Sequence, residues 1–303
     1  MNIDISFYKS IEIELKIDSR IHSPFINEVF IGNKSDYHIY LDDSVIEYKS
    51  NYLFGLSIKK IYIIIDYKVD SFCKLFYNCE CIKSITFTKF SRNNIKNMSY
   101  MFKGCSSLEK INFTNFNAKN VISMNCMFQD CESLEELDLS KFRTNKLEAA
   151  MFMFAGCKRM KKLDLSYLET KKLRRTSYMF RCCVLLENIN LKNFTTENVI
   201  TMEHMFYGCS SLKELDLSSF DTTNVEIMSW MFAKCISLKK LDLSNFNTKK
   251  VVYMNDMFNE CLSLEELDLS NFDTEEVIKM NNMFSGCKKK MKLKIPLDFK
   301  IYY

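Results

Sequence analysis

The stretch MFYGCSSLKELDLSSFDTTNV, residues 205–225, decides the fold because the chain repeats it almost unchanged. It returns as MFAKCISLKKLDLSNFNTKKV at residues 231–251 and as MFNECLSLEELDLSNFDTEEV at residues 257–277. A Met-Phe pair stands at 101, 127, 153, 179, 205, 231, 257 and 283, always 26 residues apart, and Leu75-Phe76 lies one period earlier. A period of this length is typical of solenoids, propellers and other repeat arrays.

Each unit has the pattern of a short helix followed by a short strand. The apolar residues of the first part fall at i, i+3, i+4 and i+7, the spacing of one helical stripe: Met228, Met231, Phe232 and Cys235. Leu241 and Leu243 then alternate with Asp242, as on a strand whose aspartate points outward. We therefore predict an α/β repeat, a solenoid with a parallel β-sheet on one face and short helices on the other.

One unit cannot be stable by itself. About nine apolar side chains contribute roughly 2 kcal/mol each on burial, whereas ordering the backbone costs roughly 1 to 2 kcal/mol per residue. Over the 26 residues of a unit the entropic cost is the larger, so neighbouring units must complete the burial and the strand hydrogen bonds.

The consensus MFxxCxSLxxLDLSxFxTxxV resembles the BspA-like leucine-rich-repeat family, also called the mycoplasma-type lipoprotein repeat, over about residues 72–287. The resemblance implies a leucine-rich-repeat solenoid that serves in binding, commonly on the surface of bacteria and some protists. It therefore implies an adhesin-type surface protein.

The repeat divides the chain into three parts. Residues 1–52 lie outside it and alternate like strands in SIEIELKI and YHIYLDDSVIEY, which predicts a β-rich N-terminal cap, with an independent functional domain as the alternative. Residues 53–287 are expected to form the leucine-rich-repeat solenoid, with one shortened unit and about nine units of 26 residues. Residues 288–303 form a C-terminal strand cap, whose lysines and Pro296 discourage strand addition.

Composition favours a soluble globular protein, with 47% hydrophobic and 26% charged residues and a net charge of +4. The N-terminus lacks the basic start and apolar block of a secretory signal, and no anchor motif appears. No apolar run reaches the ~18 residues that a transmembrane helix needs. The residues thus predict a cytoplasmic protein, whereas the family resemblance predicts a cell-surface or secreted one.

Nine of the thirteen cysteines follow the 26-residue period: Cys79, Cys105, Cys131, Cys157, Cys183, Cys209, Cys235, Cys261 and Cys287. Because they lie on the apolar stripe and no C-x-x-C pair exists, we expect buried, reduced thiols, with disulfides and a metal site as alternatives. The candidates for an exposed thiol lie off the period: Cys73, Cys81, Cys126 and Cys182.

Charge is segregated along the chain. Residues 141–181 hold twelve Lys or Arg and three acids, a net +9, whereas residues 182–287 hold eight Lys and sixteen acids, a net −8. The first stretch contains a basic belt: Arg143, Lys158, Arg159, Lys161, Lys162, Lys171, Lys172, Arg174 and Arg175. It is a candidate site for an acidic protein, an anionic lipid surface or a glycan, the alternative being a solvated face. Nucleic acid is disfavoured because aromatic residues do not interleave with the basic positions.

An acidic column is expected on the strand face: Asp138, Asp164, Asp216, Asp242 and Asp268. Strands about 4.8 Å apart leave neighbouring aspartates repelling by roughly 1 kcal/mol even in water. Hydrogen bonds to the following serines, a basic partner or a bound cation would each offset this repulsion, and we treat the column as a second candidate binding site.

Motifs for catalysis are missing from the sequence. His22, His38 and His204 are far apart, and no glycine-rich phosphate loop, nucleophile elbow or zinc-protease motif occurs. We predict a monomeric, non-catalytic protein-interaction module without cofactor or metal, which engages a protein or glycan of unknown identity through the solenoid face. An intracellular leucine-rich-repeat scaffold or regulator is the alternative to a surface adhesin.

Overall fold

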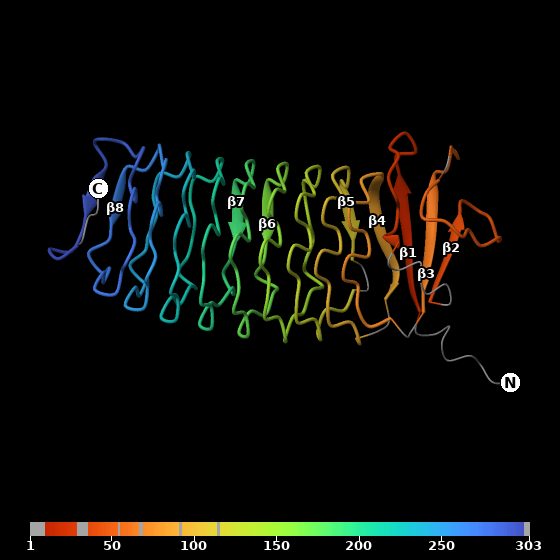
Figure 1. Ribbon diagram of the computed structural model, residues 1–303, viewed down its shortest axis with the longest axis horizontal. Coiled ribbons are helices and arrows are strands. Elements are labelled where there is room, and N and C mark those ends of the chain that lie inside the picture. The colour runs from red at the N-terminus through yellow and green to blue at the C-terminus, as the bar shows by residue number, and fades with distance from the viewer. Residues whose placement is uncertain are drawn as a thin grey trace.

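The structure, a computed structural model, describes residues 10–28, 36–53, 55–66, 69–90, 93–113 and 116–299. Figure 1 shows an elongated array of stacked rungs, with a small sheet at the N-terminal end and the C-terminus at the opposite end. The strands are β1 (Ile11–Ile17), β2 (Tyr37–Leu41), β3 (Lys60–Ile65), β4 (Ile82–Phe90), β5 (Lys110–Asn112), β6 (Lys162–Asp164), β7 (Asn188–Asn190), β8 (Glu266–Asp268) and β9 (Lys292–Lys294).

The N-terminal sheet has the strand order β2-β3-β1-β4-β5. Strand β1 pairs antiparallel with both β3 and β4, and β2 pairs antiparallel with β3. Strand β4 pairs in parallel with β5, so β4 is the place where the antiparallel sheet becomes the parallel array. In β1 the apolar side chains alternate with polar ones: Ile11, Ile13 and Leu15 are at most 1% exposed.

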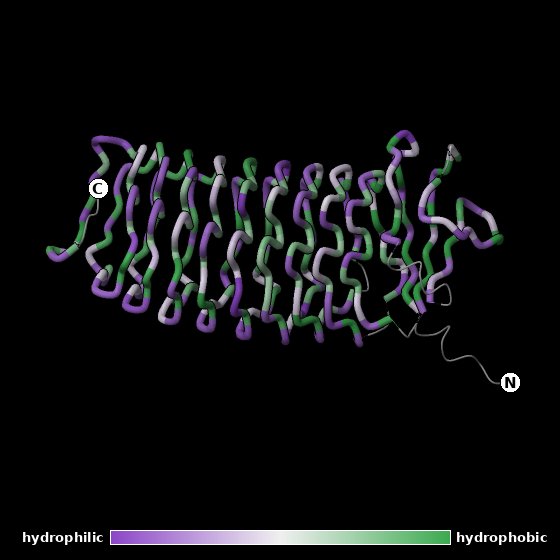
Figure 2. The backbone as a smooth tube through the Cα atoms, viewed as in Figure 1, coloured by the Kyte–Doolittle hydropathy of each residue, from purple (hydrophilic) through white to green (hydrophobic). Residues whose placement is uncertain are grey.

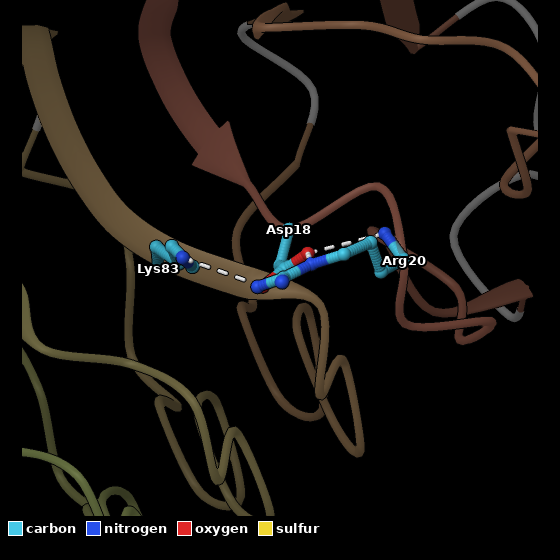
Figure 3. Close-up of polar contacts among 3 residues, drawn as sticks. All are labelled: Asp18, Arg20 and Lys83. Carbon is cyan, nitrogen blue, oxygen red and sulfur yellow. Dashed lines mark hydrogen bonds and ion pairs between the residues drawn. The ribbon is translucent and has the colours of Figure 1, made fainter.

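Asp18 ties the end of β1 to the start of β4 (Figure 3). Its carboxylate accepts hydrogen bonds from Nε and Nη2 of Arg20, at 2.9 and 2.6 Å, and lies 3.3 Å from Nζ of Lys83. The Arg20 guanidinium, followed by Lys83, holds the pKa of Asp18 well below its usual range. This ionised carboxylate therefore joins the N-terminal sheet to the first strand of the array.

A line of parallel bridges shows that the rungs stack in register. Each bridge joins residues 26 positions apart, and the line runs through Ser71, Asn97, Ser123, Ala149, Arg175, Thr201, Ile227, Tyr253 and Lys279. The period read from the sequence is therefore the length of one complete circuit of the chain.

The segment expected to be helical is a series of tight turns. In the rung that follows Ile227, the amides of Met231, Ala233 and Cys235 each donate to the carbonyl three residues earlier, at 3.1–3.2 Å. Between residues 71 and 279, no described residue lies in a helix. The prediction of an α/β class with short helices on one face is therefore wrong, and the solenoid is all-β.

Left-handed backbone conformations explain why no helix forms. Trp230 and Lys234 have φ of 62° and 61°, and equivalent positive angles recur in the other rungs. A single left-handed residue ends a right-handed helix. The successive turns still direct Met228, Met231, Phe232 and Cys235 inward, since each is 0% exposed. The inward-pointing residues thus have the sequence spacing of a helix, but the backbone that carries them is not helical.

The remaining amides of the turns join one rung to the next. Those of Met228, Trp230 and Phe232 donate to the carbonyls of the residues 25 positions further on, at 2.9–3.0 Å. Most amides of this segment thus either close their own turn or bond to the following rung, so most of the buried backbone is satisfied without a helix.

The interior is a stack of identical layers. One phenylalanine of each rung stacks on the next at 5.2–5.9 Å between ring centroids, with ring planes within 16° of parallel, from Phe76 to Phe284. Leu241 and Leu243 are 7% and 1% exposed while Asp242 between them is exposed, although this rung is not part of a named strand. Figure 2 shows hydrophobic and hydrophilic stretches alternating along the rungs, as such layers require.

Candidate binding surfaces

The acidic column lies on the strand face as expected. Asp164 is half-buried and the other four aspartates are exposed. Each accepts a hydrogen bond from the backbone N–H of the serine two residues later, at 2.8–3.0 Å: Ser140, Ser166, Ser218, Ser244 and Ser270. The serine hydroxyl and amide lower the pKa of Asp138 and Asp216 below the usual range. The carboxylates are thus held ionised by their own turns.

Two grooves run along the same face. One has a volume of about 610 Å³ and extends from Glu136 to Asp216, with Leu163 and Ile189 in its floor and Lys162 on its wall. The other has a volume of about 570 Å³ and extends from Glu109 to Arg159. Both are lined by Glu136 and Asp138, so the two grooves lie next to each other on the strand face and together extend across several rungs.

The basic belt does not form one patch. All nine of its members are exposed, but they come from different segments of the rung. Lys158 and Arg159 follow the cysteine turn and are ion-paired with Glu132 and Glu135 of the preceding rung. Lys162 lies in strand β6 on the grooved face, where Lys161 immediately precedes the strand.

The other members of the belt lie in the return segment of the circuit. Lys171 and Lys172 occupy the turn before Leu173, Arg174 precedes the bridge line and Arg175 lies on it. Arg143 lies in the corresponding return segment one rung earlier. A single ligand would have to wrap around the rung to reach all nine.

A ladder of aromatic side chains covers another face. The rings of Phe152, Tyr178, His204 and Trp230 stack at 4.4, 4.5 and 5.6 Å between centroids, with planes within 11° of parallel. All four are partly exposed and all have a positive φ, between 55° and 63°. A bulky residue in this conformation is unusual, so stacking rather than backbone preference accounts for these residues.

Basic side chains flank the aromatic ladder. Tyr207 contacts His204 and Trp230, and its ring lies 5.4 Å from the guanidinium carbon of Arg181 and 5.8 Å from Nζ of Lys234. Contacts of this kind are cation–π interactions. Tyr, Trp and Arg are also the residues that carry most of the binding energy in protein interfaces.

His204 is neutral inside the ladder. Burial, and then the nearby charge of Arg181, lower its pKa to about 4. Its Nδ1 lies 3.7 Å from Oε1 of Glu203, too far for a hydrogen bond. The ring therefore remains uncharged over the physiological range.

The nine periodic cysteines form a file through the interior, and eight of them are buried, with Cys287 half-buried. From Cys105 to Cys287, each thiol of this file donates to the phenylalanine carbonyl of the preceding rung, as Cys235 does to Phe206 at 3.2 Å. Burial raises the pKa of Cys235 to about 12. All thirteen cysteines are free thiols, and these nine are core members rather than reactive groups.

No group of three or more His, Cys, Asp or Glu among the described residues is placed to hold a metal ion. Within the same residues, no helix combines the length and the apolar composition needed to cross a membrane.

Two comparisons with known proteins gave matches. The family model described as "Mycoplasma protein of unknown function, DUF285" matches residues 70–189 and again residues 176–295. A solved structure, "Crystal structure of T. pallidum Leucine Rich Repeat protein (TpLRR)", is similar at 19% identity and a TM-score of 0.41, over 62% of this chain and 78% of that chain. No curated protein matched the chain.

Proposed function

Because this chain belongs to the family described as "Mycoplasma protein of unknown function, DUF285", we propose that it is a non-catalytic interaction module that engages a macromolecular ligand through its strand face. The family match agrees with the resemblance of the repeat to BspA-like leucine-rich-repeat proteins and makes the chain a repeat protein. Its role in binding, and as a surface adhesin, is the proposal.

The grooved strand face, with its two adjacent grooves, is the observation that carries this proposal. It spans rungs whose core residues are nearly invariant, while its rim changes from rung to rung, as in the column of Lys110, Glu136, Lys162 and Asn188. An apolar floor with a varied polar rim is the composition of a specific interface. The combined length of the two grooves suits an extended protein segment or a glycan chain better than a small molecule.

The experiment compares capture of ligands from extracts of the source cells by immobilised wild type and by two variants. Glu136→Lys/Lys192→Glu exchanges two exposed charges on the groove without changing the net charge. Arg174→Glu/Arg175→Glu alters the basic belt on another side of the rung and serves as the comparison. We expect the first variant to lose ligands that the second retains.

Retention by the groove variant together with loss by the belt variant would move the binding site to the belt. Identical ligand sets for all three proteins would contradict both candidate surfaces. Thermal unfolding of each variant establishes that the changes affect the surface and not the fold.

An intracellular scaffold is the second candidate, and the thirteen free thiols favour it, because extracellular proteins of this cysteine content usually form disulfides. Mild proteolysis of intact cells separates the two. An adhesin is degraded from outside, whereas complete protection would exclude the adhesin and leave the scaffold.

A further inference from the structure

The two ends of the array carry the most exposed apolar side chains. Val45 and Ile46, beside the N-terminal sheet, are 90% and 77% exposed, and Leu297 at the opposite end is fully exposed. Ile278, in the last rung, is 66% exposed, and the other exposed large apolar residues that the structure describes reach at most 48%. Single exposed apolar residues are ordinary, but here they concentrate at both ends of one elongated molecule.

The C-terminal end also has an uncovered layer. Phe284, Leu293 and Ile295 are half-buried, whereas the equivalent Phe258, Leu267 and Leu269 one rung earlier are at most 2% exposed. These three side chains are exposed on the side that the following rung covers elsewhere in the array.

Backbone donors follow the same edge. In the preceding rung, alternate amides donate onward, as Met254 does to Lys279 and Phe258 to Met283. No described residue accepts from the equivalent amides of Met280, Asn282, Phe284 and Gly286. The end of the array thus presents an apolar centre beside a row of backbone donors.

Lysines surround this end. Residues 279–299 contain six lysines and one acid, Asp298. Lys288, Lys289, Lys290, Lys292 and Lys294 are exposed, and Lys290 stands in the column where Leu264 is buried. The net charge of this stretch, six minus one, is +5.

The N-terminal end has the opposite charge. Strand β2 is the edge of its sheet, and residues 36–53, which contain it, hold four acids and one lysine, a net −3. Asp43 is exposed beside Val45 and Ile46. Figure 1 places β2 and β8 at opposite ends of the array, so the two charged ends cannot meet within one chain.

We propose that these chains associate head to tail, with the acidic N-terminal end of one copy docking on the basic C-terminal end of the next. Like ends repel and unlike ends attract, so the charges select this orientation over the two symmetric ones. Lysines on an edge strand discourage pairing with a neutral or basic strand edge, but they favour pairing with an acidic one. A head-to-tail contact does not close on itself and gives linear assemblies.

Such an assembly goes beyond the proposed binding function and leaves the groove free along its sides. The sequence predicts a monomer. Under this proposal the monomer is the state at high dilution, and the head-to-tail assembly forms at higher concentration. The occupant of the C-terminal end is therefore a second copy of this chain.

Sedimentation velocity over a concentration series tests this inference. The weight-average mass of wild type should rise with concentration at about 0.05 M salt and fall toward the monomer at about 1 M, where the Debye length is about 3 Å. Lys289→Glu/Lys290→Glu at one end and Asp43→Lys/Glu47→Lys at the other should each remain monomeric alone. An equimolar mixture of the two should form heterodimers, because the unaltered acidic N-terminal end of the first variant then meets the unaltered basic C-terminal end of the second.

Two further variants complete the design. Lys249→Glu/Lys250→Glu makes the same charge change at exposed positions on a rung inside the array and should associate like wild type. Leu297→Asp changes a fully exposed side chain, which leaves folding intact, and should weaken association. A wild type that stays monomeric at every concentration, or end variants that associate like the Lys249→Glu/Lys250→Glu control, would overturn the proposal.

Discussion

At the scale of single residues, small polar side chains complete the hydrogen bonding of the interior. The carbonyl of Phe206 accepts from the amide of Cys209 at 3.1 Å and from the thiol of Cys235 at 3.2 Å. A carbonyl has two lone pairs, and the cysteine of the following rung uses the second. Cysteine fits this position because it is nearly as apolar as its neighbours and still carries a weak donor.

His204 gives a pH dependence whose sign is fixed by its lowered pKa. The histidine takes up a proton near its ordinary pKa of 6.5 when unfolded, but only near pH 4 when folded. Between these values the unfolded chain binds more protons, so falling pH destabilises the folded state. We expect wild type to lose about 1–3 kcal/mol more than His204→Tyr between pH 6.5 and 4.

Urea unfolding of both proteins across this range measures the difference. The tyrosine keeps the stacking seen at Tyr178 and does not titrate there. Parallel stability curves for the two proteins would show that His204 is not protected in the ladder.

A residue signal for the left-handed turns was present in the sequence. The column of Lys234 also contains Asn78, Asp130 and the four glycines Gly104, Gly156, Gly208 and Gly286, each with a positive φ. Gly, Asn and Asp are the residues that adopt this conformation most readily. Reading that column down the rungs would have argued against a helix. The aromatic ladder could have been predicted in the same way, by following one column of the repeat. A consensus sequence hides this column because its residue type changes from rung to rung.

At the scale of elements, a buried threonine in five successive rungs, from Thr144 to Thr248, donates a hydrogen bond to the backbone of the next rung. The hydroxyl of Thr222 donates to the carbonyl of Asn247 at 2.9 Å and accepts from the amide of the same residue at 2.8 Å. Thr196 and Thr248 bond to Asp221 and Asp273 in the same way. The hydroxyl therefore acts as an inter-rung connector where the backbones are too far apart to pair.

Thr222→Val should lower the free energy of unfolding by about 2–4 kcal/mol, because it keeps the shape but leaves a buried N–H and C=O without partners. Thr222→Ser keeps the hydroxyl and should cost less. Chemical denaturation of both variants against wild type measures this. A valine variant as stable as the serine variant would mean that the connector contributes packing only.

The strand and turn segments were unequally predictable. Alternation correctly placed Leu241 and Leu243 inside and Asp242 outside, because a strand has only two faces. The apolar spacing at Met228, Met231 and Phe232 was ambiguous, because consecutive turns present the same residues inward as a helix does. The periodicity of apolar residues predicts which side chains are buried. The backbone preferences of the individual residues must decide whether a helix or a series of turns buries them.

At the scale of the whole molecule, one circuit of chain repeated in register determines almost everything. Each rung contacts its neighbours alone, as in other solenoids, so the repeat length and core could be read from the sequence. Surfaces that depend on how the circuits of chain stack could not be predicted from the sequence. The belt looked contiguous along residues 141–181 but is distributed around the rung, and the charged ends meet no neighbour within the chain.

The register of the rungs is the claim on which the other conclusions depend, and a scalar coupling across one hydrogen bond tests it directly. The amide of Phe206 donates to the carbonyl of Met231 in the next rung, at 2.9 Å. We predict a trans-hydrogen-bond coupling between the amide nitrogen of Phe206 and the carbonyl carbon of Met231 in the isotope-labelled, deuterated protein. A coupling from Phe206 to the carbonyl of Met202, four residues back as in an α-helix, would contradict the stacked-turn architecture.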